Sequence, residues 1–258
     1  MNVGTAKPSE DELQQVPHHF INSLSIDENY DVRMYEKDSL ELLERLFDKH
    51  QVVIMTGGSG MFADAVTNGM DEIPAVDAVI RKQIIEEYTA HGLEHLQQEV
   101  AKNDAEYYSQ VDQKNPQRLM RALEVIRGTG RPFSSFRIKN KVERPFQIIK
   151  VGLEREREEL YARIDSRMDQ MIGSGLFDEA KSLFNKRELN ALQTVGYTEV
   201  FGFLNGDYTK EEAIRLLKRN SRRYAKRQLT WFRKDPTIRW FHPEQEGAVE
   251  DYIKDQMG

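Results

Sequence analysis

The sequence predicts an α/β protein whose parallel-sheet core is interrupted by an all-helical insertion. A short apolar run at residues 51–56 passes into a glycine turn and then into a helical pattern, an order typical of parallel sheets. Residues 74–141, by contrast, contain helical patterns alone. We therefore expect residues 1–73 and 142–258 to form the two parts of the core, and residues 74–141 to form the insertion.

The first segment predicts a helix, a strand and a second helix in succession. Four leucines have helical spacing within residues 34–50, and the apolar run 51–56 follows as a buried strand. The turn Gly-Gly-Ser-Gly at residues 57–60 then leads into a helix at residues 61–66. Further strands are expected at residues 146–151 and 238–241.

The insertion is predicted to consist of helices at residues 76–90, 93–101 and 116–126. Asn115 is expected to cap the last of these helices, with Pro116 at its first helical position and Gly128 as its stop signal. The chain returns to the core through a helix at residues 154–172, which ends at Gly173 and Gly175.

A basic helix near the C-terminus is the most informative feature for function. Residues 209–212 form a capping box at its start, Asp235 and Pro236 end it, and residues 215–233 contain no acid although the formal net charge is -6. An apolar seam is expected at Ile214, Leu217, Tyr224 and Trp231, beside one row of Arg219, Arg223 and Arg227 and a second row of Arg215, Arg222, Lys226 and Arg233. Guanidinium rows of this kind favour phosphate binding over an ordinary solvated surface helix, which would carry both signs of charge.

Composition excludes several classes of protein. The 258 residues include no cysteine, so disulfides and cysteine nucleophiles are excluded, and a reducing compartment such as the cytoplasm is favoured. Neither an apolar run long enough to span a bilayer nor a signal peptide is present, so we expect no membrane partner. The acidic net charge argues against a wholly basic nucleic-acid coat protein, so any nucleic acid must be held locally.

Other motifs are ambiguous from the residues alone. The glycine turn around Ser59 offers amides to an anion, but a tight turn with positive φ angles is the simpler interpretation, and no G-x-x-x-x-G-K-[ST] motif is present. Gln117, Arg118 and Arg121 lie where they could contact nucleic acid or merely solvent. Tyr197 could stack on a base, although core packing is more frequent. No metal-loop spacing occurs, so no protein metal site is expected.

Taken together, the motifs resemble those of one family, the tRNA dimethylallyltransferases, over essentially the whole chain. The resemblance is carried by Gly-Thr-Ala-Lys-Pro at 4–8, Val-Pro-His-His at 16–19, Gly-Gly-Ser-Gly at 57–60, Asn-Pro-Gln-Arg-Leu-Met-Arg-Ala-Leu-Glu-Val at 115–125, Gly-Tyr at 196–197 and Tyr-Ala-Lys-Arg-Gln-Leu-Thr-Trp at 224–231. It implies a P-loop NTPase-like core, an insertion that grips the anticodon stem-loop of tRNA, and transfer of a dimethylallyl group from dimethylallyl diphosphate to the exocyclic amine of an adenine beside the anticodon. Mg²⁺ would accompany the diphosphate, and a monomer is expected.

The resemblance also implies roles for individual residues. Ser59, Lys226 and Arg227 would be catalytic, with Ser59 hydrogen-bonded to the reacting adenine. The diphosphate would be bound by Arg222, Arg223, Lys226 and Arg227. Contacts to tRNA would come from Ser59, Arg81, Gln117, Arg118, Leu119, Met120, Arg121, Thr194, Val195, Gly196 and Tyr197.

One departure from the family pattern concerns the start of the sequence. In the family, a P-loop and an Asp-Ser-x-Gln segment precede the Gly-Thr-Ala-Lys-Pro motif, and neither occurs among these residues. We therefore expect a core without its first strand, and a chain that is inactive or impaired in transfer. Two alternatives remain open: a non-catalytic tRNA-binding protein and a relative of the P-loop nucleotide kinases.

Overall fold

The computed structural model describes residues 1–5, 7–138 and 142–258, which divide into two compact units. Unit 1 comprises Met1–Ala63 and Phe146–Gly258, and unit 2 comprises Asp64–Pro145. Ala6 of the Gly-Thr-Ala-Lys-Pro motif and residues 139–141, where the insertion was expected to end, lie outside the described residues. The protein is mostly helical with a small parallel sheet, and no described helix is long and apolar enough to cross a membrane.

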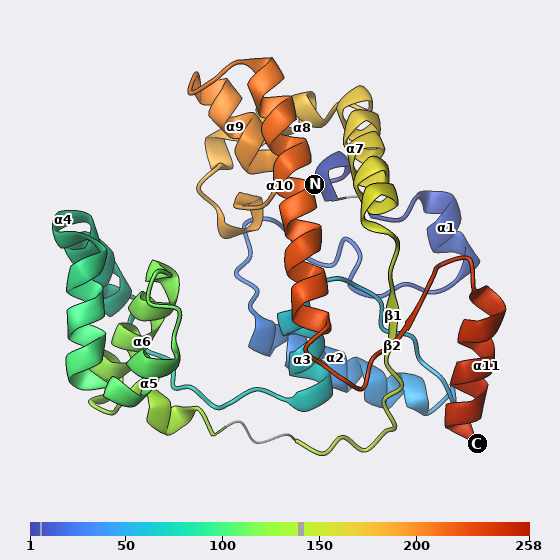
Figure 1. The fold of residues 1–258 in the computed structure, drawn as a ribbon, viewed down its shortest axis with the longest axis horizontal. Coiled ribbons are helices and arrows are strands. Elements are labelled where there is room, and N and C mark those ends of the chain that lie inside the picture. The colour runs from blue at the N-terminus through green and yellow to red at the C-terminus, as the bar shows by residue number, and fades with distance from the viewer. Residues whose placement is uncertain (6, 139–141) are drawn as a thin grey trace. The chain divides into compact units, whose positions relative to one another are not determined.

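Unit 1 contains the sheet and most of the helices. Its helices are α1 (Glu10–Gln15), α2 (Val32–Phe47), α7 (Arg157–Gly173), α8 (Leu176–Leu183), α9 (Tyr197–Asn205), α10 (Lys210–Phe232) and α11 (Glu246–Met257) (Figure 1). Strands β1 (Val151–Leu153) and β2 (Arg239–Phe241) are parallel, with Val151 opposite Arg239 and Leu153 opposite Phe241. The predicted last strand is confirmed, whereas the preceding strand begins at Val151, where the prediction had it end.

The predicted strand at residues 51–56 is absent, and this part of the sequence prediction is wrong. The segment is extended but unpaired, with Ile54 85% exposed and Val52 and Met55 also exposed. An apolar run becomes a strand only when another strand satisfies its backbone N–H and C=O groups. The described part of the chain places no strand beside this one, and the sheet consists of β1 and β2.

The helical core of unit 1 lies where α7, α8, α9 and α10 pack together (Figure 1). Its fully buried side chains include Leu176, Leu192, Val200 and Leu217. Thr209 caps α10 as predicted, because its hydroxyl accepts a hydrogen bond from the Glu212 backbone N–H at 3.3 Å. This packing fixes the orientation of α10, and hence which of its basic side chains reach solvent.

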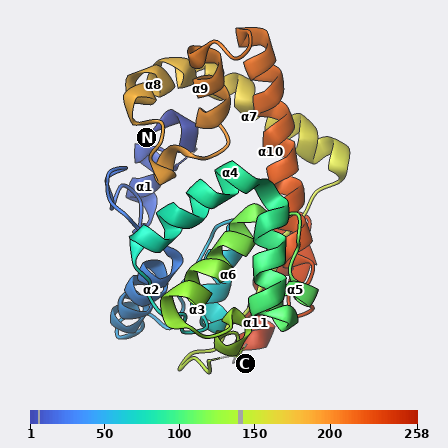
Figure 2. The ribbon, with the colours of Figure 1, turned by 90° about the vertical axis from the view of Figure 1, so that its left-hand side faces the viewer.

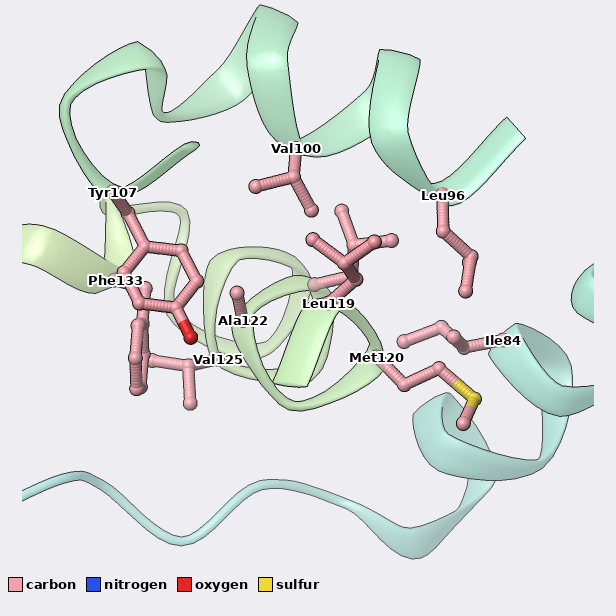
Figure 3. Packing of buried hydrophobic residues seen from close by; sticks show 10 residues of the cluster. Ile84, Leu96, Val100, Tyr107, Leu119, Met120, Ala122, Val125 and Phe133 are labelled. Atoms are coloured by element: carbon pink, nitrogen blue, oxygen red, sulfur yellow. The ribbon is translucent and has the colours of Figure 1, made fainter. Parts of the chain in front are cut away.

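Unit 2 is built from α4 (Ala78–Asn103), α5 (Ala105–Gln110) and α6 (Pro116–Thr129), which pack on one another (Figure 2). Helix α3 (Gly60–Asn68) crosses the boundary between the units. The break that the sequence predicted in the first long helical stretch is at Gly92, whose φ of 74° interrupts α4. The core formed by these helices is closely interdigitated around α6 (Figure 3).

Both ends of α6 follow from local chemistry. Asn115 caps its start as predicted, and Pro116 occupies the first turn. The predicted end at Gly128 is wrong, because the helix continues to Thr129 and ends at Gly130, which adopts the left-handed conformation with φ of 70°. Gly128 serves packing instead, since a β-carbon there would lie 2.3 Å from Val76 Cγ1.

Candidate functional site

Helix α10 passes directly over the glycine turn at residues 57–60. The Gln228 side-chain amide donates a hydrogen bond to the Gly58 carbonyl oxygen at 2.9 Å. A β-carbon added at Gly60 would lie 2.2 Å from Trp231 Cδ1, and one at Gly58 would lie 2.1 Å from Gln228 Nε2. The glycines are therefore needed for close approach rather than for positive φ, which none of Gly57, Gly58 and Gly60 adopts.

Ser59 is exposed at the start of α3, beside this contact. Its backbone carbonyl accepts a hydrogen bond from the Ala63 N–H at 3.0 Å, so Ser59 occupies the position just before the first residue of α3. A hydroxyl at a helix N-terminus, next to exposed backbone amides, can meet a polar or anionic ligand. The turn thus brings a polar group to the side of α10 that carries Gln228 and Trp231.

One set of basic residues on α10 is neutralised within unit 1. Arg222 Nη1 contacts both oxygens of Asp165 at 2.5 and 2.7 Å, and Lys218 contacts Asp169 at 2.6 Å. The remaining pairs on this helix are Arg215 with Glu212 at 2.6 Å and Arg233 with Glu154 at 2.9 Å. Arg222, predicted as a diphosphate ligand, therefore has its guanidinium engaged by a carboxylate of α7, unlike the other three predicted ligands.

A second set of basic residues on α10 is left for a ligand. Arg223, Lys226 and Arg227 are exposed and form no ion pair with any residue that the structure describes. The Arg227 guanidinium lies 5.6 Å from the centre of the Tyr224 ring, a contact that keeps its charge. These three exposed cations can neutralise an incoming anion.

The structure separates Lys226 from the glycine turn. Two residues along a helix correspond to about 200° of rotation, so Lys226 points to the side opposite Gln228. There it borders a cavity of about 630 Å³, lined also by residues of α7 and by the ends of β1 and β2. Arg223 and Arg227 occupy the exposed edge between these two sides, so the basic helix presents one continuous rim rather than a single cluster.

The cavity contains arginines that the sequence reasoning missed. Arg155 lies in the loop after β1, and Arg157 is the first residue of α7. Arg155 contacts Glu159, whereas Arg157 lies over the Tyr161 ring at 5.2 Å. Their position was detectable in principle, because ligand sites of parallel sheets lie beyond the carboxyl ends of the strands. The misplaced boundary of the predicted strand at residues 146–151 hid this signal.

Unit 2 gathers three of the predicted contact residues into one cluster. Arg81 of α4 donates from Nη1 to Glu124 Oε1 at 2.8 Å and from Nη2 to Gln117 Oε1 at 2.7 Å. Arg121 of α6 donates to Glu124 Oε2 at 2.9 Å. Arg118 is exposed on the same helix. Glu124, which holds the two arginines, was not singled out from the sequence.

Leu119 and Met120 were predicted to contact tRNA, but the structure places their side chains in the core. Their side chains are 0% and 2% exposed, and they lie in the hydrophobic core of unit 2 with Leu96 and Val100 (Figure 3). On an amphipathic helix, residues that are adjacent in the sequence can lie on opposite faces, one exposed and the other in the core. The motif at residues 115–125 contains residues of both faces of α6. Its basic residues lie at the surface, and its apolar residues pack in the core.

Tyr197 and Gly196 are likewise buried. The Tyr197 hydroxyl donates to Glu179 Oε2 at 3.1 Å, and burial together with the Glu179 carboxylate raises the pKa of Tyr197. A β-carbon at Gly4 would collide with the Tyr197 ring, so the ring packs under the N-terminal segment and cannot stack on a base. Of the predicted turn, Thr194 is exposed and Val195 is partly exposed.

The geometry defines a protein with two basic surfaces, one on α10 beside a glycine turn and one on α4 and α6. The chain belongs to the IPP transferase family, whose model matches residues 1–235. A tRNA dimethylallyltransferase of Cytophaga hutchinsonii is 49% identical over 100% of this chain and 84% of that protein. Another from Christiangramia forsetii is 47% identical over 100% of this chain and 85% of its own length.

Solved structures agree with this assignment. The full-length tRNA isopentenylpyrophosphate transferase of Bacillus halodurans has a TM-score of 0.69 and 33% identity, over 99% of this chain and 83% of that chain. A eukaryotic dimethylallyltransferase described as acting on tRNA has a TM-score of 0.78 over 98% of this chain and 69% of that chain. At 21% identity, the second likeness concerns the fold alone.

Proposed function

We propose that this protein transfers a dimethylallyl group from dimethylallyl diphosphate to the exocyclic amine of an adenine beside the anticodon of a tRNA. The family assignment gives the class of reaction. The observation that carries the proposal to particular residues is the exposed, unneutralised row of α10, a helix that contacts the glycine turn of Ser59 through Gln228 and Trp231. A P-loop-like organisation of the core is part of the same proposal.

The chemistry of the reaction suits this row of cations. An exocyclic amine is a poor nucleophile, so the allylic carbon–oxygen bond must ionise readily, with its electron pair passing to the leaving diphosphate. Arg223, Lys226 and Arg227 would stabilise the charge that develops on the diphosphate as the new carbon–nitrogen bond forms. The amine loses one proton when this bond forms, and the departing diphosphate would accept it. Ser59, on the neighbouring side of α10, would hydrogen-bond the adenine. The base must leave its stack to arrive there.

Magnesium enters the proposal only as a companion of the diphosphate. In the ranges that the structure describes, no three carboxylate or imidazole groups are placed to hold a metal ion. Mg²⁺ would therefore be held mainly through the diphosphate, and the charge that the described residues offer to a diphosphate comes from arginine and lysine.

Binding of the anticodon stem-loop is assigned to unit 2. Arg81, Gln117, Arg118 and Arg121 present donors that suit RNA phosphates and base edges, and Thr194 and Val195 of unit 1 complete the set of accessible predicted contacts. Phosphate contacts of this kind supply affinity that falls with salt.

A single-turnover transfer assay tests the proposal. The protein, in excess over an end-labelled anticodon stem-loop, is incubated with radiolabelled dimethylallyl diphosphate, and incorporation of label into RNA is followed for hours. We expect label in a stem-loop with adenine beside the anticodon and none in the same stem-loop with guanine there. These conditions detect transfer even when it is several orders of magnitude slower than usual for an enzyme.

The two alternatives give different results in this assay. Tight stem-loop binding without any transferred label would identify a non-catalytic RNA-binding protein. ATP hydrolysis in the absence of RNA, again without transfer, would favour a relative of nucleotide kinases.

A further inference from the structure

Glu124 is a buried carboxylate that holds two arginines from different helices. Its side chain is only 5% exposed, and each of its oxygens accepts one hydrogen bond: Oε1 from Arg81 of α4 at 2.8 Å, and Oε2 from Arg121 of α6 at 2.9 Å. A buried charge is tolerated only when it is paired and hydrogen-bonded. Both guanidinium groups are therefore needed to satisfy the buried Glu124 carboxylate.

The two arginines face the carboxylate on one side and solvent on the other. Their side chains are 36% and 43% exposed, and Arg81 is held a second time by Gln117 Oε1 at 2.7 Å. A guanidinium group carries five N–H donors in a planar fork, so these bonds leave donors of each group free. Two cations on one anion also leave a net positive charge at the surface.

We propose that Glu124 is a positioning residue for RNA binding: it fixes the Arg81 and Arg121 guanidinium groups as a rigid pair that grips phosphates of the stem-loop. This inference rests on the proposed function, because it assumes that unit 2 binds RNA. The gain over two free arginines is entropic, since a side chain that is held in its binding rotamer loses less freedom when the ligand arrives.

Replacing Glu124 by glutamine separates positioning from simple charge. Glu124→Gln removes a negative charge from the RNA-binding surface, so free point charges would bind RNA more tightly after the change. A positioning role gives the opposite result for the stem-loop, because one of the two acceptor oxygens becomes an NH2 group, which cannot accept from the arginine that faces it. We expect stem-loop affinity to fall about tenfold, a size typical of residues coupled in one network, while affinity for an unstructured RNA of equal length is unchanged or higher.

A matched carboxylate in the same unit provides the control. Glu87 of α4 accepts from Arg127 at 2.7 and 2.8 Å and lies outside the proposed contact set. Glu87→Gln should alter thermal stability yet preserve the preference for the stem-loop over unstructured RNA. In Glu124→Gln, the KM for dimethylallyl diphosphate should stay at the wild-type value while the KM for RNA rises.

A second variant tests the positioning role if Glu124→Gln fails to fold. Arg81→Lys keeps the charge and the ion pair with Glu124 but removes the planar fork, so it should lose stem-loop affinity in the same direction as Glu124→Gln. Wild-type affinity in folded Glu124→Gln or in Arg81→Lys would overturn the positioning role. Failure of the wild-type protein itself to prefer the stem-loop would instead count against the proposed function.

Discussion

The arginines of α10 and those of unit 2 are held in opposite ways. Arg223 and Arg227 are exposed and have no carboxylate partner among the described residues, whereas Arg81 and Arg121 converge on the buried carboxylate of Glu124. An unpaired cation keeps its full charge for a ligand, but its position is loose. A paired cation is fixed in position, but part of its charge is already compensated.

The difference matches what two kinds of substrate require. A leaving diphosphate gains charge during the reaction, so groups with uncompensated charge lower the barrier most. A folded RNA has a fixed array of phosphates, so preorganised groups contribute most to its selective binding. Basic composition alone does not distinguish a diphosphate site from an RNA-binding surface. The presence or absence of an acidic partner for each arginine does.

The largest expected effect concerns the free cations of α10. Arg227→Ala should lower kcat by on the order of 10²-fold, because one charge-stabilising donor of the transition state is lost. Lys226→Ala should have a similar effect, and tRNA affinity should change much less in both variants. Steady-state kinetics with each substrate varied in turn provide the measurement.

Arg215→Ala is the matched control for these variants. Arg215 belongs to the same helix and is also exposed, but its charge is paired with Glu212. Its removal should leave kcat close to the wild-type value. Wild-type turnover in both Arg227→Ala and Lys226→Ala would exclude these residues from the reacting site and remove the contrast between the two basic surfaces.

The glycine turn gives the next largest effect. A β-carbon at Gly60 would collide with the Trp231 ring, so Gly60→Ala should push the turn away from α10, destabilise the protein by about 1–3 kcal/mol and reduce turnover. At Gly57 no heavy atom lies within 4 Å of the added carbon, and Gly57→Ala should be nearly neutral. Urea unfolding and transfer rates for the pair provide the comparison. Equal behaviour of the two variants would show that α10 does not constrain the turn.

Local sequence signals predicted the helices well and the sheet poorly. The caps at Asn115 and Thr209 are short-range hydrogen bonds, and they place the starts of α6 and α10 correctly. The extended run at residues 51–56 has the composition of a strand, but strand formation depends on a partner that composition cannot supply. The sequence prediction likewise chose the wrong glycine as the end of α6, namely Gly128 instead of Gly130.

The candidate site shows the same division between local and long-range information. The sequence identified the basic row of α10, but it did not reveal that Asp165 neutralises Arg222. The two residues are 57 positions apart, so no local pattern links them. Leu119 and Met120 were drawn into the site by a contiguous motif, although their helical phase places them in the core. Glu124 was visible in the same motif and carried no local signal of its role.

A smaller effect tests the cavity that Lys226 borders. Arg157 lines this cavity from α7 and has no carboxylate partner among the residues described, so it should assist Lys226 if a phosphate group enters. Arg157→Ala should then raise the KM for dimethylallyl diphosphate by roughly tenfold, the usual size for one charge-assisted hydrogen bond. Arg163→Ala, an exposed arginine of α7 outside the cavity lining, is the control. An unchanged KM in Arg157→Ala would restrict the diphosphate site to the outer rim of α10.

The smallest effect is a pH dependence of stability in unit 2. Hydrogen bonds from Arg127, aided by His95, lower the pKa of Glu87 from 4.5 to about 2. A carboxylate with a lowered pKa in the folded state stabilises the protein fully above pH 4.5, and this contribution is lost as the pH falls toward 2. Glu87 is partly exposed, so we expect the contribution to be below about 1 kcal/mol. The Tm difference between wild type and Glu87→Gln, measured by circular dichroism, should be constant from pH 7 to 5 and should shrink below pH 4.5. A difference that stays constant through the acid range would show that Glu87 contributes by packing rather than by its charge, which would leave Glu124 as the better case for a carboxylate that acts by holding arginines.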